Sequence, residues 1–202
     1  MIDQRLRTTK DRWIDPVATR LPAVATPGLV TLLSFVVTLL AAVLAGLGSR
    51  WWSLGVWLLG RFLDGLDGAV ARYRATQGDL GGYLDLVADT VGYAAVPLAI
   101  AFAQGERGTW IACALLLASF YANAISWTLL AAIAEKRGRG AASYGAKTTV
   151  HMPPGLIEGA ETIVFYVAML ARPEQAAELF GAMAVLVTVT IGQRVVWAMR
   201  SL

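Results

Sequence analysis

The sequence has little charge, one cysteine and one histidine, and each scarcity excludes a class of protein. Charged residues make up 15% of the 202 positions and hydrophobic residues 57%, whereas an ordinary soluble domain has about 25% charged residues. This balance excludes a disordered chain and a nucleic-acid-binding arm. Cys113 has no second cysteine, so a disulfide scaffold is excluded, and His151 alone is too little for a histidine-based zinc site. The mean hydropathy of +0.59 indicates a membrane protein instead.

Long uncharged runs predict where the chain crosses the membrane. Residues 29–47 and 108–134 contain no charged side chain and are long enough to span a bilayer. Shorter apolar runs reach that length by including polar residues. We predict an all-α membrane protein with six transmembrane helices in a single domain, residues 1–202. The helices are expected at residues 28–48, 52–74, 81–103, 109–133, 154–171 and 175–199.

The basic residues predict the orientation of these helices. With six spans, both termini lie on one side of the membrane. That side collects twelve basic residues: Arg5, Arg7, Lys10, Arg12, Arg20, Arg72, Arg74, Lys136, Arg137, Arg139, Lys147 and Arg200. The other side has three: Arg50, Arg107 and Arg172. Because Lys and Arg accumulate on the cytoplasmic side, we expect a multi-pass inner or plasma membrane protein with cytoplasmic termini.

The segment before the first span, residues 1–27, is predicted to be an amphipathic interfacial helix. Ile2, Leu6, Trp13 and Val17 fall roughly on one helical face, and Lys10 lies elsewhere. Such a helix lies in the plane of the membrane surface. A frayed, charged tail is the alternative.

Four aspartates give the second and third predicted helices an acidic face each. Asp64 and Asp67 are three residues apart, and Asp85 and Asp89 are four residues apart, so each pair shares one helical face. A turn around residues 73–80, with Gly78 and Asp79, returns the chain. An antiparallel helix pair can therefore bring the two acidic faces together.

Carboxylates that face one another in a membrane are costly unless positive charge lies between them. Divalent metal ions are the natural compensation, and oxygen ligands favour Mg²⁺ or Mn²⁺ over zinc or copper. Two such ions would clamp a phosphoryl or diphosphoryl group. Small residues such as Gly65 and Gly68 surround the acidic pairs and allow a ligand or another backbone to approach closely. Ordinary packing of membrane helices is the other explanation for these small residues.

The spacing of this segment resembles the signature of the CDP-alcohol phosphotransferase family. The eight matching residues are Asp64, Asp67, Gly68, Ala71, Arg72, Gly81, Asp85 and Asp89. Thr26-Pro27 and Val30-Thr31, at the start of the first span, are similar to a Thr-Pro-Asn-x-Val-Thr motif of the family, with Gly28 in the place of asparagine. The six-helix plan and the N-terminal helix also resemble that family. The resemblance further implies that the protein is a homodimer.

The resemblance implies roles for these residues. Asp64, Asp67, Asp85 and Asp89 would hold two divalent ions, and Asp89 would also be the general base. Gly68 and Ala71 would leave room for the cytidine, and Arg72 and Thr31 would contact the nucleotide donor. The reaction would transfer a substituted phosphoryl group from a CDP-linked donor, most often CDP-diacylglycerol, to an alcohol, with release of CMP. The active site would open towards the cytoplasm.

The acceptor alcohol is less well defined by the sequence. Lys147, Thr148, His151 and Arg194 could bind a phosphate on the acceptor, although cytoplasmic loops are basic regardless of function. The run from Pro153 to Leu156 lacks the arginine found in relatives that use inositol phosphate, which argues against that acceptor. Glu158 and Glu161 could form a structural salt bridge or recognise the acceptor, and the sequence does not separate these roles.

Two other functions compete with the leading one. A CDP-choline or CDP-ethanolamine transferase that acts on diacylglycerol would carry the same motif. A metal-ion transporter would also carry carboxylates within the membrane, although the sequence shows no inverted repeat. Release of CMP distinguishes both enzymes from the transporter.

Overall fold

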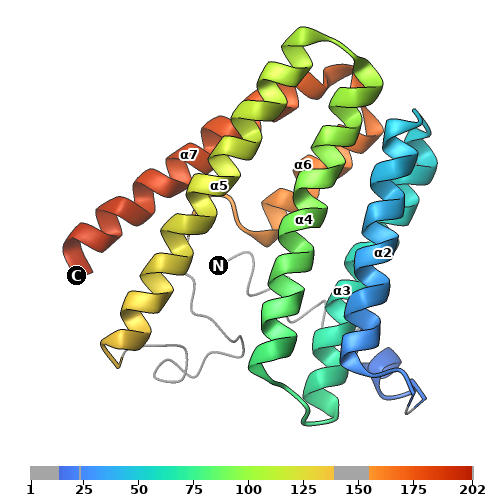
Figure 1. Cartoon of the computed structure of the whole chain (residues 1–202), viewed down its shortest axis with the longest axis vertical. Helices are drawn as coiled ribbons and strands as arrows, with labels where there is room; N and C mark the ends of the chain where they lie inside the picture. The colour runs from blue at the N-terminus through green and yellow to red at the C-terminus, as the bar shows by residue number, and fades with distance from the viewer. Residues whose placement is uncertain (1–13, 23, 139–154, 202) are drawn as a thin grey trace.

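The computed structural model describes residues 14–22, 24–138 and 155–201, and these residues form helices and short connections without a strand. Figure 1 shows the helices as a bundle of long rods. Their bounds are α2 (Pro27–Gly46), α3 (Arg50–Tyr73), α4 (Asp79–Gln104), α5 (Arg107–Lys136), α6 (Gly159–Ala171), the 3₁₀ turn η2 (Pro173–Gln175) and α7 (Ala176–Ser201). The prediction of an all-α protein is confirmed for this part of the chain.

The helices form two groups joined by a shorter helix (Figure 1). Helix α2 packs against α3 and α4, and α5 packs against α7. Helix α6 contacts both α3 and α7, so it lies between the two groups. This arrangement puts the two helices with the acidic residues, α3 and α4, in one group with α2.

Four helical segments are long and apolar enough to cross a membrane: α2, α4, α5 and the segment from Pro173 to Arg200. Helix α3 has 24 residues but carries several charges. Helix α6 has 13 residues, which at 1.5 Å per residue is about 20 Å, short of the ~30 Å hydrocarbon core. A multi-pass membrane protein is therefore supported, and the count of six spans stays a prediction.

Helix α6 begins five residues later than predicted. Glu158 is its N-cap and forms a capping box with Glu161: each side chain accepts a hydrogen bond from the other residue's backbone N–H. The Glu158 carboxylate also accepts from the Gly155 N–H at 3.0 Å, and the Ile157 N–H donates to Thr190 Oγ1 at 3.0 Å. The backbone of residues 155–158 thus bonds to side chains instead of continuing a helix, and both glutamates have a structural role in the cap.

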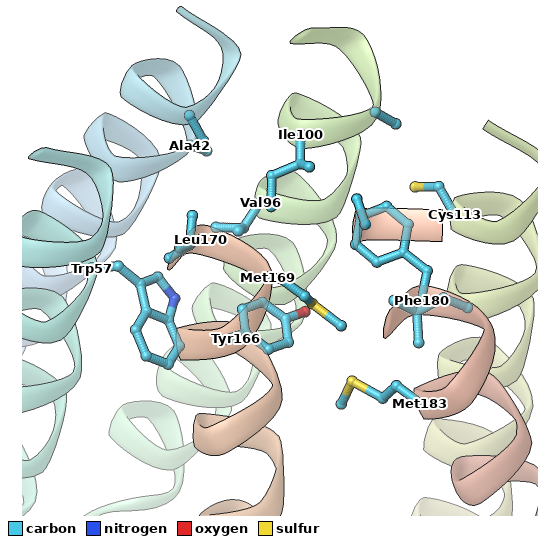
Figure 2. Close-up of a cluster of buried hydrophobic side chains, with 14 of the residues drawn as sticks. Ala42, Trp57, Val96, Ile100, Cys113, Tyr166, Met169, Leu170, Phe180 and Met183 are labelled. Carbon is cyan, nitrogen blue, oxygen red and sulfur yellow. The ribbon is translucent and has the colours of Figure 1, made fainter. Parts of the chain in front are cut away.

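A buried aromatic cluster joins α6 to α3 and α4, and Figure 2 shows its Trp57 and Tyr166. Tyr166 stacks on Trp57, with ring centroids 5.4 Å apart. It also meets Tyr93 edge to face, with ring centroids 5.1 Å apart. Pro97 lies inside α4 and has no N–H, so it cannot bond to the carbonyl four residues earlier, which is that of Tyr93. The Tyr166 hydroxyl donates to this carbonyl and so satisfies a backbone group that the proline leaves without its helical partner.

The N-terminal segment packs against the end of the α2–α3–α4 group. Residues 14–18 are helical, and Ile14 and Ala18 are buried in a small cluster with Val30, Leu66 and Val70. Helical structure at this end of the segment agrees with the prediction. The amphipathic face predicted over residues 1–13 lies outside the described residues, and the interfacial position stays a prediction.

Candidate active site

The four aspartates come together between α3 and α4, as their spacing predicts. The carboxyl groups of Asp64 and Asp85 lie within hydrogen-bonding reach of each other, and Asp85 also interacts electrostatically with Asp67 and Asp89. Asp67 is only 6% exposed, whereas the other three are partly exposed. One acidic cluster, defined as Asp64, Asp67, Asp85 and Asp89, is thus built from two helices.

Close packing around one threonine of α2 brings these helices together. A Cβ atom added to Gly60 of α3 would lie 2.8 Å from Thr38 Oγ1, and one added to Gly92 of α4 would lie 2.8 Å from Thr38 Cγ2. Real side chains do not approach so closely, so both positions require glycine. The sequence therefore permits α3 and α4 to approach α2 at Thr38, next to the acidic cluster.

The start of α2 also reaches the cluster. Thr26 caps the helix by accepting the Leu29 N–H at 3.3 Å, and Pro27 follows it as the first helical residue, an arrangement that favours helix initiation. One turn later, Thr31 Oγ1 lies 2.7 Å from Asp67 Oδ2 and 3.1 Å from the Pro27 carbonyl. The structure thus places Thr31, a predicted donor contact, directly beside an aspartate of the cluster.

Arg61 is the cation that the structure places against the acidic cluster. Its Nη1 lies 2.6 Å from Asp89 Oδ1 and 3.7 Å from Asp64 Oδ2. The guanidinium also donates to Tyr93 Oη at 3.3 Å and to Thr38 Oγ1 at 3.2 Å. Helices α2, α3 and α4 therefore all hold this side chain.

The donor set of the cluster fits hard divalent cations, although its geometry is not that of a closed metal site. The cluster contains four carboxylates, two of which lie within 4 Å of the Arg61 guanidinium, and oxygen ligands with excess negative charge favour Mg²⁺ or Mn²⁺. In the part of the chain that the structure describes, no three His, Cys, Asp or Glu side chains are grouped tightly enough to hold a metal ion. Arg61 forms an ion pair with Asp89 and lies near Asp64. These carboxylates would therefore have to shift to bind an ion.

The predicted donor residues follow Asp67 along α3. A Cβ added to Gly68 would meet only the Arg72 guanidinium, at an ordinary contact distance of 3.5 Å. Arg72 Nη2 lies 3.8 Å from Oδ1 of Asp15 in the N-terminal segment.

A hollow of about 290 Å³ lies between this segment and the end of α3. It is lined by Asp15, Ala18, Thr19, Ala69, Arg72 and Tyr73. Arg72 thus borders an open space, while Ala71 is partly buried on the same helical turn.

Arg194, a predicted acceptor residue, is held by α5 and by the start of α6. Its side chain is 5% exposed, its Nη1 donates to Asn123 Oδ1 at 2.5 Å, and it interacts electrostatically with Glu158. These contacts join α5, α7 and the start of α6. Lys147, Thr148 and His151 lie outside the described residues, so the predicted acceptor pocket cannot be assembled from them.

Sequence reasoning assigned no role to Arg61, and it missed Thr38 and Tyr93. A signal for Tyr93 was present, because it follows Asp85 and Asp89 at the same four-residue spacing and therefore shares their face. An arginine within a span also indicates a functional site. Thr38, in contrast, is one of several small polar residues in α2, and nothing in its spacing singles it out.

The fold and the cluster define a helical membrane protein with an acidic site between two neighbouring helices. Residues 24–191 match the CDP-alcohol phosphatidyltransferase family. The chain belongs to this family and is a phosphatidyltransferase of phospholipid biosynthesis. The resemblance inferred from the spacing of the aspartates is confirmed.

Known proteins support this assignment over most of the chain. The inner membrane protein YnjF of Escherichia coli (strain K12) is 37% identical over 168 residues, covering 82% of this chain and 80% of YnjF. The crystal structure of phosphatidylinositol phosphate synthase (PgsA1) of Mycobacterium tuberculosis with CDP-DAG bound is similar with a TM-score of 0.72 and 26% identity, covering 91% of this chain and 92% of that one. The same enzyme in complex with manganese and citrate has a TM-score of 0.71 at 23% identity, covering 90% and 87%.

Proposed function

We propose that this protein transfers the phosphatidyl group of CDP-diacylglycerol to an acceptor alcohol and releases CMP. The observation that carries the proposal is the acidic cluster between α3 and α4, formed by the four aspartates whose spacing resembles the signature of this family. The choice of donor is supported by the similar PgsA1 structure, which has CDP-DAG bound.

In the proposed reaction, Asp89 acts as the general base. It accepts the proton of the acceptor hydroxyl, whose oxygen forms a new bond to the phosphorus atom that carries the diacylglycerol. The bond from this phosphorus to the bridging oxygen breaks, and that oxygen leaves as part of CMP. Asp89 is partly exposed, which suits this task because the base must reach a proton on the bound acceptor.

The aspartates of the cluster would hold the donor through divalent metal ions. Asp64, Asp67 and Asp85, together with Asp89, would bind Mg²⁺ or Mn²⁺, two ions by analogy with the family. When bound, the ions neutralise the donor diphosphate and the charge that develops on CMP. Thr31 fixes Asp67 from α2, so this ligand would be oriented before the donor arrives.

The donor and acceptor lie on different sides of the cluster in this proposal. Gly68, Ala71, Arg72 and Thr31 face the nucleotide, and Thr31 lies beside Asp67 of the cluster. Arg194, with Lys147, Thr148 and His151, contributes to binding the acceptor. The predicted location is the inner membrane, as the name of the YnjF relative supports. Both termini and the active site face the cytoplasm, and the enzyme is a homodimer.

The direct test measures CMP release from CDP-diacylglycerol by protein purified in detergent with Mg²⁺. The acceptors are glycerol 3-phosphate, inositol phosphate, inositol, serine and phosphatidylglycerol. We expect CMP release that depends on one acceptor. Asp89→Asn should lose nearly all turnover and still bind the donor, because the other three aspartates remain. Absence of release with every acceptor would contradict the proposal, and loss of donor binding in Asp89→Asn would contradict the role of Asp89.

A further inference from the structure

We propose that Arg61 is a positioning residue for Asp89 and the resident counter-cation of the acidic cluster. The inference rests on the proposed function, because it assigns Arg61 a role in the same reaction. Of the four aspartates, Asp89 has the short contact with the guanidinium, 2.6 Å from Nη1 to Oδ1. Arg61 thereby orients this carboxylate through its Oδ1 atom.

The guanidinium is fixed from several directions. Its side chain is 10% exposed, it bonds to Thr38 and Tyr93, and its central carbon lies 5.1 Å from the Tyr93 ring centroid and 5.9 Å from that of Trp57. Trp57 and Tyr93 are in turn held by Tyr166 of α6. The position of Asp89 is therefore set by the core of the protein and not by a freely rotating side chain.

The chemistry of this site requires arginine in particular. A planar guanidinium can donate to three partners in fixed directions while resting on aromatic rings, whereas the ammonium of lysine is a single point charge. The buried Nε of Arg61 has no hydrogen-bond partner among the described residues. The side chain is thus held by its two terminal nitrogens, which are the ones that reach Asp89 and Thr38.

The position of the charge has a second consequence. Nη1 is 3.7 Å from Asp64, a proposed metal ligand, so Arg61 repels a divalent ion at the same cluster. Removing the charge should therefore strengthen metal binding while it weakens catalysis. A residue that only maintained the fold would change both in the same direction, so the opposite signs identify the role.

The experiment compares Arg61→Gln and Arg61→Lys with the wild-type protein. Binding of MnCl₂ is followed by electron paramagnetic resonance, and CMP release from CDP-diacylglycerol gives kcat and KM. In Arg61→Gln we expect kcat to fall roughly 10- to 100-fold, KM for the donor to stay within about threefold, and Mn²⁺ affinity to rise at least about fivefold. Arg61→Lys should recover part of kcat and keep the wild-type Mn²⁺ affinity.

Two further variants and a control keep the test decisive if Arg61→Gln is unstable. Thr38→Val and Tyr93→Phe each remove one hydroxyl that holds the guanidinium, with almost no change in shape or charge. Both should lower kcat severalfold without a change in Mn²⁺ affinity. Arg50→Gln removes another arginine of α3, which lies beside Glu174 and Trp51, and should leave kcat unchanged.

The outcomes separate this inference from the proposed function. If the wild type releases CMP and the Arg61 variants match it in kcat, the inference is wrong and the function stands. If kcat, Mn²⁺ affinity and thermal stability fall together in Arg61→Gln, and Thr38→Val and Tyr93→Phe have no effect on kcat, Arg61 is structural and the inference is overturned. If the wild type releases no CMP with any acceptor, the proposed function fails first.

Discussion

Replacing Gly68 by alanine tests whether the surface of α3 beyond Asp67 receives the donor. A methyl group at this position meets only the Arg72 guanidinium, at 3.5 Å, so the protein itself has room for it. Alanine also favours a helix over glycine by about 0.5–1 kcal/mol. Without donor, Gly68→Ala should therefore be as stable as the wild type or more stable.

Binding of the donor should respond in the opposite direction. If the cytidine packs against Gly68, the added methyl overfills the contact at a cost of about 1–3 kcal/mol. This corresponds to a roughly 5- to 150-fold weaker affinity for CDP-diacylglycerol. The assay is a donor titration in detergent with Mg²⁺, paired with a thermal unfolding curve of the same sample.

Two other glycines of α3 are matched controls for this variant. Gly55 has nothing within 4 Å of an added Cβ, so Gly55→Ala should change neither donor affinity nor the fold. Gly60→Ala would push against Thr38 Oγ1 at 2.8 Å and should unfold at a lower temperature. Wild-type donor affinity in Gly68→Ala would refute the nucleotide contact. A parallel loss of stability and affinity would refute the inference that the protein has room for a methyl group at Gly68.

The remaining predictions concern the aromatic cluster and the α6 cap. Tyr166→Phe leaves the Tyr93 carbonyl without its donor and should destabilise the protein by about 1–3 kcal/mol. The same change should cost much less in a Pro97→Ala background, where the new N–H can bond to that carbonyl; equal costs in SDS unfolding titrations would show that the hydroxyl has another role. Glu158→Ala removes the capping box of α6 and should cost about 0.5–2 kcal/mol. Glu106→Ala, at an N-cap whose side chain makes no capping bond, should cost almost nothing by the same measurement, and an equal loss in both would contradict the account of the cap.

Periodicity and spacing predict much of this molecule, because they concern local structure. The uncharged runs placed the long helices to within a few residues, except for the late start of α6 at Gly159. That start depends on Thr190 of α7, which accepts a hydrogen bond from the preceding loop. A contact between residues 33 positions apart leaves no trace in the local pattern, so the predicted helix included the loop.

In the site, too, local features were predictable from the sequence and long-range contacts were not. The aspartates were predictable because their spacing fixes a common face of each helix, and the turn between the helices brings the faces together. The contacts that α2 makes with the site were not predictable. Thr31 of α2 bonds to Asp67, and Thr38 of the same helix bonds to Arg61. Arg74 is a further example: it bonds to the carbonyls of Ala25 and Pro22 before α2, which sequence alone gave no reason to expect.

The central claim is phosphatidyl transfer, and product stoichiometry tests it most directly. Purified protein would be given CDP-diacylglycerol, Mg²⁺ and the acceptor that supports CMP release, with Asp85→Asn as the inactive control. CMP and the new phospholipid would be quantified by mass spectrometry in the same sample. The account predicts one phospholipid for each CMP with the wild type, and neither product with Asp85→Asn. Equal amounts of CMP and phosphatidic acid, which indicate hydrolysis by water, or no CMP at all would contradict it.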